Sequence, residues 1–363
     1  MQAHRQTLDL FPILQETPAP DGSASLTGIA RMAANSSSAG EGHEIEFRFL
    51  KARSILNRSV SRRGMWFAWS INPYRGCEFA CRYCYARYTH EFMELPPEAF
   101  EKRIFVKENA AWLLEQELRQ VRPGEEIALG TATDPYQPAE RREKVTQSLL
   151  DVLARQEGLR IGLVTKSTLI ERDIPLLKKV AERNTLVLHV TITTPRTDLA
   201  RLLEPRAPRP DLRLRTVRRL RDAGLKVGIL CSPLLPGLTD TGKALDGMAK
   251  RAQAAGASFF SAQPLFLKPC SKGVYLAFIR EHFPELEVMY RQRFDSDAFV
   301  SQAYSKRIAL MVDAVCAKYG LGRRRGDALL TREAESGAGT DRIQPKTGGR
   351  PRWLGGKGQL LMG

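Results

Sequence analysis

Short apolar segments alternate with helical segments through the middle of the chain, and this alternation constrains the fold more than any other feature. The apolar runs predict strands at 127–129, 161–164, 185–192, 226–230 and within 257–267. Apolar residues at helical spacing predict the helices 110–121, 145–152, 174–181, 212–223 and 244–255. Strands and helices that alternate in this way form parallel βαβ units, so the sequence predicts an α/β fold.

Three cysteines form a compact motif upstream of these segments. Cys77, Cys81 and Cys84 stand at C-x3-C-x2-C spacing, and Tyr83 directly precedes the third. This spacing lets one loop wrap a metal centre, and thiolates are ligands of iron–sulfur clusters and of structural zinc. A four-iron cluster normally takes four cysteines, so three would leave one iron open. The spacing alone also allows a Cys3His zinc site with His90 as the fourth ligand.

The residues around the cysteines make the motif more specific. Residues from Ser70 to Cys77 read SINPYRGC, and residues from Cys84 to Arg87 read CYAR. These strings resemble the radical S-adenosylmethionine (SAM) superfamily, in the branch related to spore photoproduct lyase and labelled DNA repair photolyase-like. The resemblance extends over about Glu46–Phe283. It implies a [4Fe–4S] cluster on the three cysteines, SAM bound at the open iron, and reductive cleavage of SAM to a 5′-deoxyadenosyl radical.

The expected fold is therefore a partial (β/α)6 barrel of the radical SAM type, with about six strands after the cysteine loop. Residues 1–45 show no periodicity and are expected to be a largely disordered N-terminal extension. Residues 46–283 are expected to form the radical SAM core. A helical pattern predicts a C-terminal cap over 284–319. A basic, glycine-containing tail, expected to be disordered, follows over 320–363.

In parallel α/β barrels the functional residues lie at the C-terminal ends of the strands. The resemblance implies SAM contacts there, and it assigns Thr133 and Asp134 to the ammonium group. Many superfamily members carry Gly-Gly-Glu at the end of strand two, whereas this chain carries GTATD over 130–134. The alternative for Asp134-Pro135 is a turn that caps the next helix.

Further SAM contacts are assigned by the same resemblance. Lys166 is expected at the carboxylate or ribose, Thr193 at the ribose, and Tyr83 near the adenine. Arg206 is a further candidate for the carboxylate, and the alternative is a surface ion pair with Glu204. Lys166 is harder to explain structurally, because an ammonium group that ends an apolar strand needs a partner.

Two further cysteines, Cys231 and Cys270, fall at predicted strand ends and are the candidate catalytic thiols. Either could return a hydrogen atom to a product radical, and the alternative for both is inert packing. The photoproduct lyase has a hydrogen-donating cysteine near the end of strand two. Here Ala132 stands at about that place, and no cysteine lies between Cys84 and Cys231. Thymine-dimer repair by the same donor would need Cys231 or Cys270 as a substitute.

Composition bears on partners and compartment. The 56 basic and 40 acidic residues give a net charge of +16, which favours polyanionic partners such as DNA or RNA. The alternative is a generally arginine-rich proteome. No apolar run approaches the roughly 18–20 residues of a membrane span. The first ten residues lack an apolar signal core, so a cytoplasmic protein without membrane association is expected.

These observations predict a radical SAM enzyme that acts on a nucleic acid, with a lyase of DNA repair as the nearest model. A reductant such as flavodoxin or ferredoxin is the implied partner, and the oligomeric state is not indicated. The first alternative is a nucleic-acid-binding module with a structural zinc site. The second is an enzyme of the same chemistry that acts on a peptide or small molecule.

Overall fold

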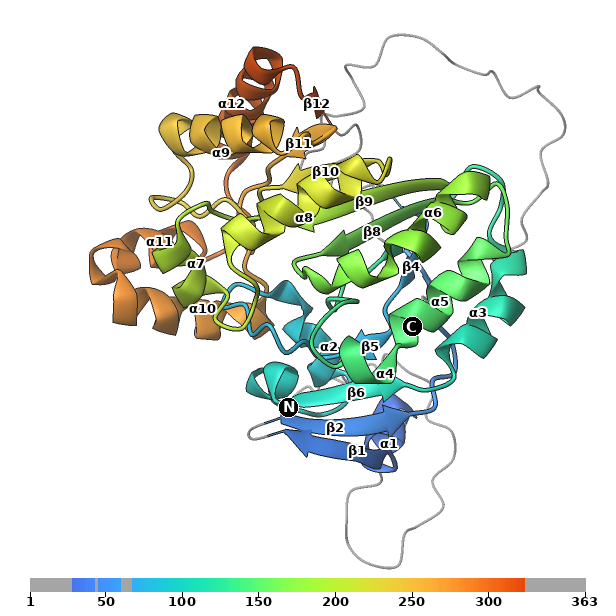
Figure 1. Cartoon of the computed structure of the whole chain (residues 1–363). Coiled ribbons are helices and arrows are strands. Elements are labelled where there is room, and N and C mark those ends of the chain that lie inside the picture. Colours follow the sequence, from blue (N-terminus) through green and yellow to red (C-terminus); the bar gives the residue numbers. More distant parts are fainter. Residues whose placement is uncertain (1–27, 43–44, 60–66, 324–363) are drawn as a thin grey trace, which may run out of the picture.

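The computed structural model describes residues 28–42, 45–59 and 67–323. An eight-stranded sheet forms its centre, in the order β12-β11-β10-β9-β8-β7-β4-β3 (Figure 1). The strands are β3 (Leu56–Arg58), β4 (Trp69–Ile71), β7 (Glu126–Leu129), β8 (Arg160–Thr165), β9 (Thr185–Thr191), β10 (Val227–Leu230), β11 (Phe259–Ser261) and β12 (Gly322–Arg323). All pairs from β4 to β12 are parallel, and β3 pairs antiparallel with β4.

Helices follow the parallel strands and cover the sheet, as the α/β prediction requires (Figure 1). They are α3 (Ala110–Glu117), α5 (Val145–Ala154), α6 (Ile174–Arg183), α8 (Pro210–Asp222), α9 (Gly242–Ala254) and α12 (Gln302–Tyr319). The mixed α/β class with a parallel sheet is confirmed. Within residues 67–323, six strands of the central sheet, β7 to β12, follow the cysteine loop, in agreement with the predicted count of about six. The first barrel strand, Trp69–Ile71, precedes the loop and is too short to show a period.

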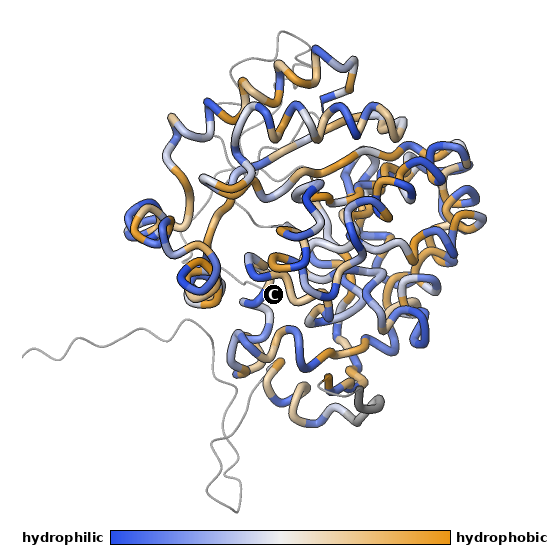
Figure 2. The backbone as a smooth tube through the Cα atoms, turned by 60° about the vertical axis from the view of Figure 1, so that its left-hand side comes forward, coloured by the Kyte–Doolittle hydropathy of each residue, from blue (hydrophilic) through white to orange (hydrophobic). Residues whose placement is uncertain are grey.

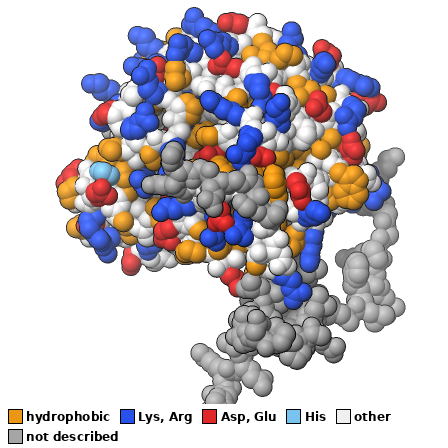
Figure 3. Space-filling model, turned by 60° about the horizontal axis from the view of Figure 1, so that its bottom comes forward, with side chains coloured by type: hydrophobic (Ala, Val, Ile, Leu, Met, Phe, Trp, Pro, Cys, Tyr) orange, Lys and Arg blue, Asp and Glu red, His pale blue; other side chains and the backbone are white. Residues whose placement is uncertain are grey.

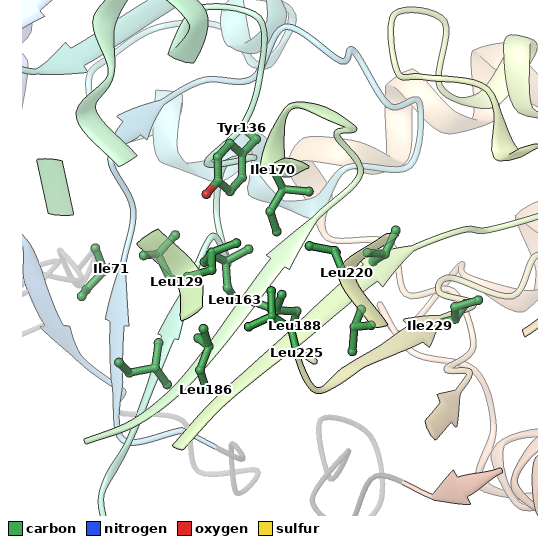
Figure 4. Close-up of a cluster of buried hydrophobic side chains, with 14 of the residues drawn as sticks. Ile71, Leu129, Tyr136, Leu163, Ile170, Leu186, Leu188, Leu220, Leu225 and Ile229 are labelled. Atoms are coloured by element: carbon green, nitrogen blue, oxygen red, sulfur yellow. The ribbon is translucent and has the colours of Figure 1, made fainter. Parts of the chain in front are cut away.

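The core lies where the sheet meets these helices. Ile71, Leu129, Leu163 and Leu188 come from four successive strands, and Leu220 reaches them from α8 (Figure 4). All five are fully buried. Burying one such side chain stabilises a fold by about 1.5–3 kcal/mol. Figure 2 shows hydrophobic residues along the strands, while the helices alternate between hydrophobic and hydrophilic residues. Strands buried on both faces are typical of parallel sheets covered by helices.

A second sheet lies beside the cysteine loop. Its order is β1-β2-β6-β5, formed by β1 (Ser37–Gly42), β2 (Ile45–Leu50), β6 (Arg103–Lys107) and β5 (Tyr74–Arg75). The helix α1 (Gly28–Ala34) precedes it. The prediction of disorder through residue 45 was therefore wrong over 28–42. Polar and small residues there hide the pattern, because the hairpin gains its order by pairing with a distant strand.

The C-terminal part is helical, as predicted. After α10 (Pro269–His282), the segment contains α11 (Glu287–Arg293) and α12, and α12 packs on α9 and β11. Gly320 ends α12 with a positive φ of 61°, and β12 then extends the sheet. The rest of the predicted tail, from residue 324, lies outside the described residues. None of the described helices is long and apolar enough to cross a membrane.

Candidate active site

A cavity of about 240 Å³ lies at the C-terminal ends of the parallel strands. Cys77, Cys81 and Cys84 line one side of it. The segments 130–134 and 164–166, which follow β7 and β8, line the next side. Loops after β10 and β11 complete the wall. The structure therefore brings the cysteine motif to the strand ends, where parallel α/β folds place their functional residues.

The three thiols are suited to binding an iron–sulfur cluster, because its iron ions supply the positive charge that a buried thiolate needs. Burial raises the pKa of all three, and that of Cys81 rises to about 12. A thiolate in this place is therefore unfavourable unless a metal binds it. In the described part of the chain, no three His, Cys, Asp or Glu side chains converge tightly enough to hold a single metal ion. In a four-iron cluster each thiolate binds a different iron, so the three cysteines need not converge on one metal ion.

His90 is placed away from any zinc site. Its Nε2 donates to the carbonyl of Arg103 at 2.9 Å, and its ring packs against Phe100 and Phe105. Burial lowers the pKa of His90 to about 4. His90 does not line the cavity. The structure thus gives no support to the Cys3His alternative.

Buried polar groups hold the start of the cysteine loop. The Gly76 carbonyl accepts from the hydroxyl of Thr133 at 2.6 Å and from Nε2 of Gln137 at 3.3 Å. The Glu78 backbone N–H donates to Oε1 of Gln137 at 2.9 Å. Gly76 has a φ of +84°, and a Cβ there would lie 2.8 Å from two backbone carbonyl oxygens. Glycine is therefore required at this turn, and Gln137 fixes the loop.

A second buried network holds the middle of the loop through Tyr83, which lines the cavity. Its hydroxyl donates to Glu204 and lies 3.0 Å from the hydroxyl of Thr193. Thr193 also donates to Glu204, at 2.8 Å. Glu204 forms an ion pair with Arg213 at 2.6 Å, and both side chains are 1% exposed. Lys166 lies 5.7 Å from the centre of the Tyr83 ring.

Charge compensation explains why these groups stay ionised. Burial acts to raise the pKa of Glu204, but the charges of Arg213 and Lys166 outweigh it and lower that pKa. Burial acts to lower the pKa of Lys166, but Cys81 and Glu204 raise it on balance. The sequence analysis missed Arg213 altogether, since an arginine in a basic helix gives no signal of a buried partner.

Asp134 combines a structural role with a place at the cavity. Its Oδ1 accepts from the hydroxyl of Thr165 at 2.7 Å and from the N–H of Tyr136 at 2.9 Å. Its Oδ2 accepts from the N–H of Lys166 at 2.7 Å. Burial raises the pKa of Asp134, and these hydrogen bonds act against that rise. The hydrogen bond from Tyr136 forms the expected turn, but the next helix has Ala139 and not Asp134 at its N-cap. The other two hydrogen bonds join the ends of β7 and β8.

The geometry agrees with comparison to known proteins. Residues 71–245 match the model of the Radical SAM superfamily. An uncharacterised protein of Mycobacterium bovis is 34% identical over 281 residues, which are 76% of this chain and 82% of that protein. The chain belongs to the radical SAM superfamily. It is accordingly a radical SAM enzyme, and the family implies a [4Fe–4S] cluster and SAM as its cofactors.

Other relatives of this radical SAM chain agree. An uncharacterised protein of Methanocaldococcus jannaschii is 30% identical over 197 residues, which are 54% of this chain and 71% of that protein. A cysteine-to-serine variant of spore photoproduct lyase has a similar fold, with a TM-score of 0.55 at 15% identity over 84% of this chain and 86% of that one. Another variant of that lyase, with bound SAM and a dinucleoside spore photoproduct, has a TM-score of 0.55 at 13% identity, over 85% and 86%.

Four of the predicted residues do not line the radical SAM cavity: Thr193, which is buried behind Tyr83, Arg206, Cys231 and Cys270. Arg206 is exposed and lies 3.5 Å from the carbonyl of Glu101, while its expected partner Glu204 pairs with Arg213 instead. The thiol of Cys231 is buried and points to the Thr193 carbonyl at 3.5 Å, and that of Cys270 points to the Tyr85 carbonyl at 3.6 Å. Both thiols are packed against backbone, as the inert alternative expects.

Part of the cavity wall is aromatic. Tyr85 and Phe266 line the cavity with ring centres 5.2 Å apart, and Phe299 stacks on Phe266 at 5.3 Å. The hydroxyl of Tyr85 donates to the carbonyl of Thr131. The sequence analysis missed this row. Phe266 falls within the segment 257–267 that was predicted to hold the sixth strand, and Phe299 falls within the predicted helical cap. Nothing in the sequence indicates that these two rings meet.

Proposed function

We propose that this radical SAM enzyme acts on a nucleic acid and that a base of the substrate enters the cavity. When bound, the cluster and SAM supply a 5′-deoxyadenosyl radical by one-electron reductive cleavage. The observation that carries the substrate class is the aromatic row, which is continuous with the wall that bears the cluster cysteines. Aromatic side chains bind nucleobases by stacking, at about 1–3 kcal/mol per base.

The chain's polar residues would hold the cofactors. Cys77, Cys81 and Cys84 would each bind one iron through a thiolate. Lys166 lines the cavity together with the cysteines, and its ammonium suits the carboxylate of SAM. Tyr83 offers an aromatic face to the adenine. Thr193 is buried behind Tyr83 and would act by orienting that hydroxyl rather than by touching the ribose.

Two expected contacts need revision on this geometry. The hydroxyl of Thr133 and both oxygens of Asp134 are engaged within the protein, although both residues line the cavity. We therefore assign the SAM ammonium to backbone carbonyls of 130–134 beside them. Arg206 lies outside the cavity and has no assigned part in binding SAM.

Among the described residues, no cysteine besides the three of the motif lines the cavity. The proposed reaction is therefore abstraction of a hydrogen atom from the substrate, with 5′-deoxyadenosine as the co-product. A lyase reaction of DNA repair is the nearest form of it. Cys231 and Cys270 would reach a substrate radical only after a local rearrangement. The electron would come from a reductant of the flavodoxin or ferredoxin type.

The test is hydrogen transfer from a labelled substrate. The anaerobically reconstituted protein is mixed with dithionite, SAM and oligonucleotides that carry deuterated thymidine, with and without ultraviolet irradiation, or with RNA. Deuterium in 5′-deoxyadenosine, together with faster SAM cleavage, is the expected result for one of them. If every nucleic acid leaves both the rate and the label unchanged, the substrate assignment is wrong, while the radical SAM chemistry stands.

A further inference from the structure

A group of cations without acceptors lies at the rim of the cavity. Lys268 directly precedes α10, and its ammonium lies 4.2 Å from the ring centre of Tyr88 and 5.8 Å from that of Tyr85. Within the described ranges, this ammonium makes no hydrogen bond or ion pair, and the Tyr88 hydroxyl makes no hydrogen bond. Since Tyr85 lines the cavity, Lys268 stands directly outside it.

Arg75 is a second cation that acts on Tyr88. It is half-buried in β5, and no acceptor for its guanidinium is found among the described residues. Its charge acts to lower the pKa of Tyr88, against the larger effect of burial, so the two groups are close neighbours. The basic rim is the name used below for Arg75, Tyr88 and Lys268. It offers hydrogen-bond donors that no oxygen of the described residues accepts from.

A further cation stands behind the basic rim. Arg75 pairs with Phe105 across the strands, which places Lys107, two residues on, on the same face of the sheet. Lys107 is 4% exposed. Burial and the charge of Arg75 lower the pKa of Lys107 to about 7, and Glu117 acts in the opposite direction. An anion at the rim would reduce this repulsion.

Elsewhere on the surface, arginines are commonly paired. Arg196 pairs with Asp198, and Arg209 with Asp211. On the face shown in Figure 3, basic side chains are scattered with acidic ones between them. The net charge therefore does not show where a polyanionic partner binds, whereas cations without an acceptor beside a cavity indicate a binding site. Cys270 and Glu91 act to raise the pKa of Lys268, against the larger effect of burial.

We propose that Arg75, Tyr88 and Lys268 bind a backbone phosphate of the substrate, next to the base that enters the cavity. This inference rests on the nucleic-acid substrate proposed above. A guanidinium, an ammonium and a phenol are the donors that suit a phosphodiester, and the positive end of the α10 dipole lies on the same side. The basic rim would thus fix the strand while the aromatic row holds the base.

The experiment measures the affinity of the full-length reconstituted protein for a fluorescent single-stranded oligodeoxynucleotide over a range of salt concentrations. Lys268→Gln is expected to weaken binding about five- to tenfold and to reduce the slope of log K against log salt by about 0.7–1, as for one lost phosphate contact. Tyr88→Phe, which keeps the ring, should weaken binding less. Lys243→Gln, an exposed lysine of α9, is the matched control and should bind like the wild type.

A neutral methylphosphonate placed at each linkage in turn identifies the contact. One position should weaken wild-type binding, and Lys268→Gln should lose nothing further at that position. If the wild type binds but Lys268→Gln matches Lys243→Gln in affinity and slope, the rim is refuted and the nucleic-acid function survives. If the wild type binds no oligonucleotide, the proposed substrate fails as well. If inorganic phosphate competes only in the wild type while the oligonucleotide binds both variants equally, the rim binds free phosphate and the inference is wrong.

Discussion

The two sides of the cavity are built differently. On the cysteine side, buried side chains such as Gln137, Glu204 and Arg213 make hydrogen bonds or an ion pair that hold the loop at several points. On the substrate side, Phe266 lines the cavity from the loop after β11, and Phe299 stacks on it from the loop before α12. A fully satisfied polar network fixes one geometry, whereas an apolar wall tolerates different occupants. The difference suggests that cofactor chemistry and substrate choice can be altered separately.

The largest effect is expected from the cysteine motif. Cys81→Ala should reduce the iron content to near zero and abolish 5′-deoxyadenosine formation, because the other two thiolates cannot hold the cluster. Iron analysis and chromatography of the products measure both. Cys316→Ala, a buried cysteine of α12, is the control. Undiminished 5′-deoxyadenosine from Cys81→Ala would contradict the assigned ligand set.

The next effect concerns the network behind Tyr83. Glu204→Gln leaves the buried Arg213 charge without its partner and should lower the free energy of unfolding by about 3–5 kcal/mol. Urea denaturation of the anaerobic protein measures it. Glu157→Gln breaks an exposed pair with Arg183 and should leave the denaturation midpoint unchanged. Equal midpoints for both variants would mean that the cysteine side is not held by buried charge.

A smaller and more selective effect is expected on the aromatic side. Phe266→Ala should weaken binding of an oligonucleotide substrate by about 1–3 kcal/mol, because one stacking surface is lost. The affinity for SAM should change less. Titrations with each ligand compare the two losses, and Trp112→Ala, which removes an exposed ring on α3, is the control. A larger loss of SAM affinity would erase the distinction between the two sides.

The smallest effect is expected at Cys231. Cys231→Ala should leave SAM cleavage within about twofold of the wild type and cost roughly 1 kcal/mol of stability, a typical value for one substitution. Its thiol is packed in the core against the Thr193 carbonyl. Iron content and 5′-deoxyadenosine yield check this. Loss of iron would show that a cluster ligand had been assigned to the wrong residue.

The parallel core could be predicted because its strands are apolar and its helices periodic, as the close match of 161–164 to β8 illustrates. The first strand, Trp69–Ile71, and the hairpin at 37–50 could not, because three residues show no period and the hairpin depends on a distant partner. Local sequence patterns do not predict such strands, because pairing with distant segments decides their structure.

The site shows the same division. The cysteines and Lys166 were predicted, since their residue types at strand ends or at a fixed spacing suggest chemistry without a fold. A surface ion pair between Glu204 and its sequence neighbour Arg206 was the alternative interpretation, whereas the partner of Glu204 in space is Arg213. The fold alone decides which arginine lies near. The aromatic row depends in the same way on two loops that meet only in the folded chain.

The measurement that tests the central claim most directly is the metal content and absorption spectrum of the anaerobic wild-type protein, followed by addition of dithionite and SAM. About four irons per chain, a broad brown absorption band and released 5′-deoxyadenosine are the predicted result. One zinc per chain, no visible band and no 5′-deoxyadenosine would contradict it.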